Sequence, residues 1–223
     1  MGRSIQQVDF AEWLDFLFDH SVTEPAWHWS TEVDEWNGSP AETLSHLTRT
    51  FRESGTALAK YSDAQLKQGF WYLADAGCSN IACSLDDRSA PEVARLEAIE
   101  SIGDLFEHCF ARRCSDHLSH LDEPGANSLN DICYMWWDVL PICGQPEDPA
   151  RKRTDAAVLQ ILERTLQLDS EACRESALHG LGHWQRHYPQ EVERIIHHFI
   201  WSHRQIRDPL RNYAYAARHG DLL

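Results

Sequence analysis

The chain has 223 residues, of which 43% are hydrophobic and 25% are charged, so its composition excludes wholesale disorder and permits a sizeable buried core. Its net charge of −15 argues against general nucleic-acid binding, because a phosphate backbone requires a basic protein surface. An acidic surface fits a basic protein partner or simply keeps the protein in solution.

The first third of the chain predicts helices separated by one long loop. Apolar spacing indicates a helix from about Gln6 to Asp19. The segment 20–38 breaks this pattern and contains Trp27, Trp29 and Trp36, so we expect a loop there. Two further helices are predicted, one after the Ser39 cap and one after the Ser62 cap.

The rest of the chain also predicts helices. They are expected at about 91–117, 128–140, 155–168, 170–188, from Pro189 onward, and from Pro209 to Gly220. The segment 144–149 contains two prolines and is the clearest candidate for an internal hinge. We therefore expect an all-α fold of about nine helices with no strand, forming a single domain over residues 1–223.

One pattern occurs twice. The sequence E-x-x-R-x-x-A-[IL]-x-x-[IL]-G begins at Glu92 and again at Glu171, and both copies read as helix. Self-similarity at this spacing is typical of stacked helical hairpins of roughly 40 residues each. The second copy, followed by a helix that begins at Pro189, resembles HEAT-like alpha-alpha repeats. The resemblance implies stacked antiparallel helix pairs forming a superhelix, with a concave surface that binds other macromolecules.

Several features bear on where the protein acts. The N-terminal sequence lacks the apolar core of a signal peptide, and no stretch of 18 uninterrupted apolar residues occurs, so we expect a cytoplasmic protein that does not enter membranes. The seven cysteines include no C-x-x-C pair and are expected to remain reduced thiols.

A row of polar residues at a spacing of four lies in the second repeat copy. It comprises Glu175, His179, His183 and His187, which would share one helix face. Glu175, His179 and His183 could hold a metal ion with a position left for water, whereas the three histidines could instead belong to a binding surface. The alternative is structural, with Gly180 and Gly182 allowing another helix to approach closely.

The nine tryptophans offer a second group of candidate binding residues. Trp27, Trp29 and Trp36 are expected in a loop with polar neighbours, and Trp136 and Trp137 are adjacent on one predicted helix. Large aromatic side chains serve cores and interfaces equally, so both interpretations stay open for these residues.

The leading functional hypothesis is a non-enzymatic protein-binding module, of the type of a bacterial immunity or adaptor protein, that engages a basic partner through an acidic, aromatic-containing face. No nucleotide-binding or serine-hydrolase motif occurs, and no cofactor is expected. The alternatives are a metal-dependent enzyme using the Glu/His row and an acidic mimic of DNA. Pairing of two chains through exposed aromatic side chains also remains open.

Overall fold

A computed structural model describes residues 4–30 and 33–222, and nearly all regular structure in these residues is helical. The predicted all-α class is therefore confirmed. The chain divides into two compact units. Unit 1 comprises Met1–Cys109 and Val139–Pro141, and unit 2 comprises Phe110–Asp138 and Ile142–Leu223.

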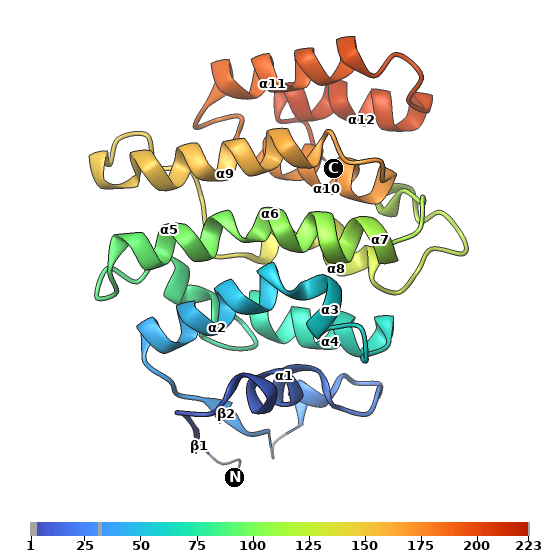
Figure 1. Cartoon of the computed structure of the whole chain (residues 1–223). Coiled ribbons are helices and arrows are strands. Elements are labelled where there is room, and N and C mark those ends of the chain that lie inside the picture. The colour runs from blue at the N-terminus through green and yellow to red at the C-terminus, as the bar shows by residue number, and fades with distance from the viewer. Residues whose placement is uncertain (1–3, 31–32, 223) are drawn as a thin grey trace. The chain divides into compact units, whose positions relative to one another are not determined.

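Unit 1 contains six α-helices, two short 3-10 helices and one pair of very short strands in its described part (Figure 1). In chain order they are β1 (Ser4–Ile5), α1 (Phe10–Phe18), η1 (Trp27–Trp29), β2 (Glu35–Trp36), α2 (Pro40–Arg52), α3 (Ser54–Ala57), α4 (Asp63–Ala74), η2 (Ala82–Leu85), α5 (Glu92–Glu100) and α6 (Ile102–Leu105). The π-helical turn η3 (Phe106–Phe110) follows α6.

The strand pair was not expected. β1 pairs in parallel with β2, with Ser4 opposite Glu35 and Ile5 opposite Trp36. β1 ends just before the helix that we predicted from about Gln6, and β2 lies in the predicted loop 20–38. The helix α1 begins only at Phe10, because Asp9 forms a capping box in which its carboxylate accepts the Ala11 and Glu12 backbone N–H groups at 2.9 Å.

Helix packing in unit 1 follows the apolar faces predicted from the sequence. Figure 1 shows α2 between α1 and the nearly continuous helices α5 and α6, and α2 contacts all three. α1 also packs against α4, where Gly69 allows a close approach to the carbonyl of Leu17. Trp13, Leu17, Phe51 and Phe70 are completely buried in this core.

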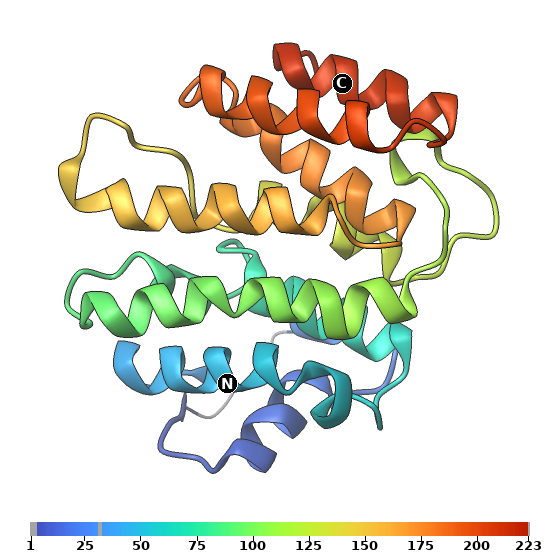
Figure 2. The ribbon, with the colours of Figure 1, turned by 45° about the horizontal axis from the view of Figure 1, so that its top comes forward.

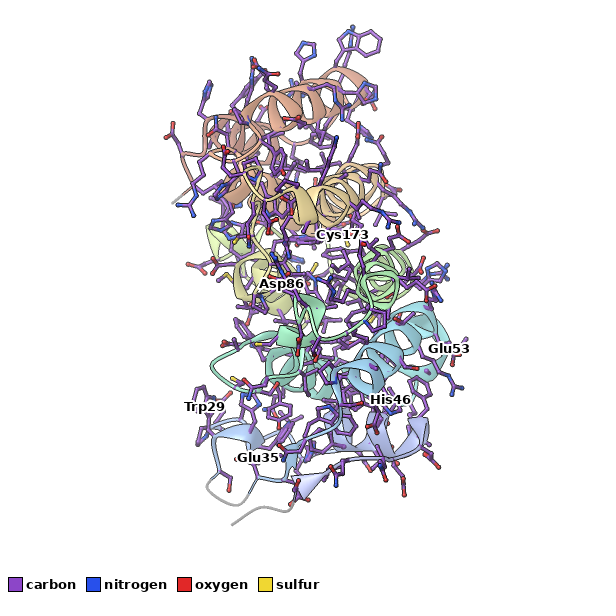
Figure 3. The ribbon with its side chains drawn as sticks, turned by 90° about the vertical axis from the view of Figure 1, so that its left-hand side faces the viewer. Trp29, Glu35, His46, Glu53, Asp86 and Cys173 are labelled. Carbon is purple, nitrogen blue, oxygen red and sulfur yellow. The ribbon has the colours of Figure 1, made fainter. Side chains whose placement is uncertain are left out.

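His46, which is labelled in Figure 3, belongs to an aromatic stack between α1 and α2. Its ring stacks on Trp13, with the centroids 5.0 Å apart and the planes 10° from parallel. Burial lowers the pKa of His46, and nearby Glu42 raises it by a smaller amount. The folded protein therefore resists protonation of this imidazole more than the unfolded chain does.

We expect this histidine to make the folded state less stable in mild acid. Below about pH 6.5 an unfolded histidine binds a proton that folded His46 excludes, so the free energy of unfolding falls as the pH decreases through that range. Urea unfolding at several pH values measures this effect. As the pH decreases, the free energy of unfolding should fall less for His46→Gln than for the unchanged protein. The exposed His219 provides the control variant His219→Gln, and an equal effect of both substitutions would contradict the prediction.

Every regular element in the described part of unit 2 is a helix. Its elements are α7 (Ala111–Arg113), η4 (Ser119–Leu121), α8 (Asn130–Val139, of which Val139 belongs to unit 1), η5 (Pro149–Arg151), α9 (Lys152–Thr165), α10 (Glu171–Trp184), α11 (Pro189–Ser202) and α12 (Asp208–His219). Figures 1 and 2 show α11 and α12 side by side, next to α9 and α10. α10 contacts α9, α11 and α12, so it forms the centre of this unit.

The two copies of the repeated pattern occupy helices in different units. The apolar positions of the first copy, Ala98, Ile99 and Ile102, are fully buried, and so are their counterparts Ala177, Leu178 and Leu181. The first copy is interrupted between α5 and α6, whereas the second forms the continuous helix α10. The pattern therefore marks the buried face of one helical segment in each unit.

The segment 144–149 does not lie at the division between the units. It belongs to unit 2, where the Gln145 backbone N–H and the Tyr188 hydroxyl both donate to Asp155 Oδ2 at 2.7 Å. The Gln145 bond attaches the predicted hinge to α9, and the Tyr188 bond attaches the start of α11 to the same carboxylate. All seven cysteines lie among the described residues, and none of them forms a disulfide. Among the described residues, no helix is both long and apolar enough to cross a membrane.

Candidate functional site

A pocket of about 630 Å³ opens on unit 1 beside α1. Its floor and walls are apolar or aromatic, and three carboxylates lie among them. The lining residues are Ile5, Glu12, Asp15, Phe16, His20, Trp27, Ser30, Val33 and Asp34. This volume lies within the range of small-ligand pockets in proteins, about 300–1,000 Å³.

The polar side of α1 supplies two of the carboxylates. Asp15 and Phe16 follow Glu12 by three and four residues, so both are neighbours of Glu12 on the surface of the helix. Glu12 Oε2 also accepts the Asp9 backbone N–H at 3.1 Å, which completes the capping box and restrains the side chain. The start of α1 thus determines where the two carboxylates lie.

Trp27 forms part of the aromatic wall. The His20 ring stacks on it, with centroids 3.7 Å apart and an angle of 11° between the planes, and Tyr72 of α4 contacts it with centroids 4.8 Å apart. The Tyr72 hydroxyl donates to the backbone carbonyl of Asp34 at 3.4 Å, which connects α4 with the segment that contributes the third carboxylate. The wall is therefore held by contacts to a core helix.

The electrostatics of the pocket are dominated by acidic groups. The Lys60 ammonium and the Tyr61 hydroxyl each donate to Asp15 Oδ1 at 2.7 Å, and the Lys60 hydrogen bond is the main reason that the pKa of Asp15 is lowered. Asp15 therefore stays ionised, and Lys60 offsets part of its charge. Glu12 and Asp34 add two further acidic groups, and no lysine or arginine occurs among the lining residues that the structure describes.

The other loop tryptophans differ in their surroundings. Trp29 is 63% exposed at the surface of unit 1 (Figure 3). Trp36 is half-buried, because its ring packs edge-on against Trp13 at 4.7 Å and its Nε1 donates to Thr43 Oγ1 at 2.8 Å. Of the three predicted binding residues in this loop, only Trp27 lines the pocket.

Trp136 and Trp137 belong to the core of unit 2 and not to a binding surface. Their exposed fractions are 0% and 4%. Adjacent residues point in different directions from a helix, and both indoles are buried because α8 has neighbours on more than one side. Trp136 packs edge-on against Phe110 with centroids 5.6 Å apart, and Trp137 covers Gly180 of α10.

The predicted histidine row is shorter than its spacing suggested. α10 ends at Trp184, so His187 lies beyond the helix, where its ring accepts a hydrogen bond from Arg186 Nε at 2.9 Å. His179 and His183 do lie together, with their Nε2 atoms 3.0 Å apart. Burial is the main cause that lowers the pKa of His179 to about 4, so this imidazole is neutral near neutral pH.

The oxygens of Glu175 bind to η4 and not to the two histidines. It is completely buried, and its oxygens accept the backbone N–H groups of Ser119 and His120 at 2.9 and 3.0 Å and the His120 Nδ1 group at 2.5 Å. The predicted ligand Glu175 therefore fastens η4 to α10 instead. Buried carboxylates are stabilised by such donors, and this use of the oxygens leaves them unsuited to a metal ion beside His179.

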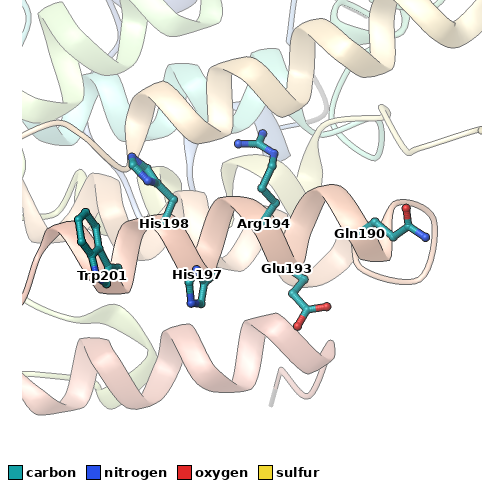
Figure 4. Close-up of a pocket in the computed structure, with 6 residues that line it drawn as sticks. All are labelled: Gln190, Glu193, Arg194, His197, His198 and Trp201. Atoms are coloured by element: carbon teal, nitrogen blue, oxygen red, sulfur yellow. The ribbon is translucent and has the colours of Figure 1, made fainter.

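A second cavity, of about 560 Å³, lies along α11 (Figure 4). Its lining residues are Gln190, Glu193, Arg194, His197, His198 and Trp201. Arg194 is paired with Glu163 of α9, and Glu193 with Arg218 of α12, so the strong charges of this groove are compensated within unit 2. The pocket of unit 1 has the more unbalanced charge.

No protein-family model matches this chain, and no curated protein and no solved structure matches it significantly. The functional interpretation therefore depends on the geometry alone. Sequence reasoning identified Trp27 but missed Glu12, Asp15 and Asp34, because acidic residues on a helix face or in a loop are ordinary surface features until the fold brings them around one pocket.

Proposed function

We propose that the protein is a non-enzymatic binding module, and that the pocket of unit 1 receives a lysine or arginine side chain from a basic protein partner. One observation carries this proposal: three carboxylates lie around apolar walls in a pocket large enough to admit a long side chain. A long basic side chain has the complementary composition, because its aliphatic stem favours apolar surface while its head group favours carboxylates.

The charge of the whole chain supports the same partner class. A net charge of −15 attracts a basic protein at long range and speeds its encounter, and the pocket would then fix one side chain in place. The exposed Trp29, which follows Trp27 in the same short helix η1, offers apolar contact area beside the pocket. A cytoplasmic location and a role like that of acidic immunity or adaptor proteins are parts of this proposal, as is the HEAT-like arrangement.

We expect the double variant Glu12→Gln/Asp34→Asn to bind a fluorescein-labelled lysine–alanine peptide about tenfold more weakly than the unchanged protein. Each lost carboxylate removes an attraction of up to about 1 kcal/mol at a partly exposed site, and about 1.4 kcal/mol corresponds to tenfold in affinity. Glutamine at position 12 can still accept the Asp9 N–H group, so the capping box of α1 is retained. Fluorescence anisotropy at two salt concentrations measures the change.

The control is Glu147→Gln/Asp221→Asn, which removes two exposed acidic groups from unit 2. It changes the net charge by the same amount without touching the pocket, so its peptide affinity should be close to that of the unchanged protein. Equal weakening by both double variants would mean that overall charge binds the peptide, and the proposed pocket would be rejected. A glutamate–alanine peptide should not bind.

A further inference from the structure

Three side chains from two helices of unit 2 direct ligand atoms at one point. His183 Nε2 lies 3.0 Å from His179 Nε2 and 3.4 Å from Asp138 Oδ1, and all three ligand atoms lie within 4.8 Å of one another. His179 and His183 come from successive turns of α10, whereas Asp138 comes from the last turn of α8.

We propose that Asp138, His179 and His183 bind one divalent transition-metal ion of the zinc class. A tetrahedral ion with bonds of about 2.0–2.1 Å holds its ligand atoms about 3.3 Å apart, which lies between the two short distances observed here. Two imidazoles and one carboxylate suit zinc and its neighbours, while calcium and magnesium prefer oxygen ligands alone. The three protein ligands leave a fourth position for water or for a group from another molecule.

The packing of α8 on α10 places Asp138 beside the histidines. Gly180 lies between His179 and His183 in the sequence, and a Cβ atom there would lie 2.8 Å from Trp137 Cγ and from Leu162 Cδ2. The missing side chain therefore lets Trp137 approach α10 closely. Asp138, the next residue, is brought to the histidines by the same contact.

The environment of His179 fits a metal ligand. Its exposed fraction is 6%, and its Nδ1 lies 2.7 Å from the Tyr213 hydroxyl, which in turn lies 3.0 Å from the Tyr134 hydroxyl. If Nδ1–H donates to Tyr213, the Nε2 lone pair points at the cluster, since a neutral imidazole carries only one N–H group. Tyr213 is therefore a positioning residue for this ligand.

Glu175 contributes to the same arrangement from further away. It fixes η4 through three hydrogen bonds, and the His120 ring of η4 stacks on Tyr213 with centroids 4.2 Å apart. Through these contacts the buried carboxylate holds the residue that orients His179. The residue we first expected to ligate the ion thus supports the site indirectly.

Zinc and cobalt(II) binding to chelator-treated protein tests the proposal. We expect one ion per chain by calorimetry, and visible absorption bands of tetrahedral cobalt(II). His183→Ala and Asp138→Ala should each weaken binding about 100-fold or more, because each removes a ligand. Both side chains are more than 40% exposed, so these variants should stay folded, which circular dichroism will check. Tyr213→Phe should retain the stoichiometry but bind about tenfold more weakly.

The matched control is His197→Ala, which removes an exposed histidine of α11 outside the cluster and should bind metal normally. Binding that is equally strong in His183→Ala and in the control would overturn the proposal, and so would the absence of stoichiometric binding by the unchanged protein. In that case the three residues form only a hydrogen-bonded chain. The result is independent of the pocket in unit 1, because Glu12→Gln/Asp34→Asn should leave metal binding unchanged.

Discussion

Asp155→Ala is expected to lower the free energy of unfolding by about 3–5 kcal/mol, the usual cost of removing one partner from a buried ion pair. Asp155 and Arg151 are each only 1% exposed, and their charged groups lie 3.4 Å apart across one turn. Asp155 also accepts hydrogen bonds from Gln145 and Tyr188. The substitution removes these bonds and leaves the Arg151 guanidinium buried without its carboxylate. Urea denaturation followed by tryptophan fluorescence measures the loss.

The matched control for this prediction is the exposed ion pair between Glu163 and Arg194, whose side chains are 32% and 60% exposed. Glu163→Ala should cost less than about 1 kcal/mol, because water screens the pair. The double variant Arg151→Met/Asp155→Leu should recover much of the stability, since it removes both buried charges together. If Asp155→Ala and Glu163→Ala lowered the free energy of unfolding equally, burial would not determine how much the first ion pair contributes to stability.

Gly69→Ala should destabilise unit 1 by about 3 kcal/mol, near the upper end of the cost of overpacking a core. A Cβ atom at position 69 would lie 2.3 Å from Phe18 Cδ1 and 2.5 Å from the Leu17 carbonyl oxygen. The carbonyl belongs to the backbone of α1, so α1 and α4 would have to separate. Alanine improves helix propensity by only about 1 kcal/mol, which is too little to compensate. Thermal and urea unfolding should both show the change.

Gly182→Ala provides the comparison. Its Cβ atom would also be too close to a neighbour, 2.2 Å from Leu222 Cδ1, but this neighbour is the end of a flexible side chain near the C-terminus. We expect a change within about 1 kcal/mol, because Leu222 can move and the helix gains propensity. If Gly182→Ala lowered the free energy of unfolding as much as Gly69→Ala, the loss of stability would not depend on whether the obstructing atom belongs to the backbone or to a flexible side chain.

Local signals predicted most helix positions correctly. Ser39, Ser62 and Ser170 each cap the helix that follows, as their side-chain chemistry indicates. Proline at the start of α11 and glycine after α12 also mark real helix ends, and Gly220 has the positive φ of 72° that favours glycine. The start of α1 was misplaced because the Asp9 capping box was overlooked.

The candidate sites were less predictable. The spacing of His179 and His183 was sufficient to place both on one helix face, because an α-helix returns after nearly four residues. Their partner Asp138 lies on another helix, and nothing local distinguishes it from other exposed acidic residues. The burial of Trp136 and Trp137 likewise depended on how many helices surround α8, which the periodicity of one helix does not specify.

By itself, the sequence determined the helical class, most helix boundaries, the acidic surface and the histidine pair, because each follows from residues close together in the chain. Only the tertiary structure decided which carboxylates lie near Trp27 in one pocket. It also placed Asp138 rather than Glu175 beside the histidines, and it buried Glu175 against η4. These outcomes depend on contacts between helices far apart in sequence, whose geometry is set by side-chain packing and by close approaches at Gly69 and Gly180.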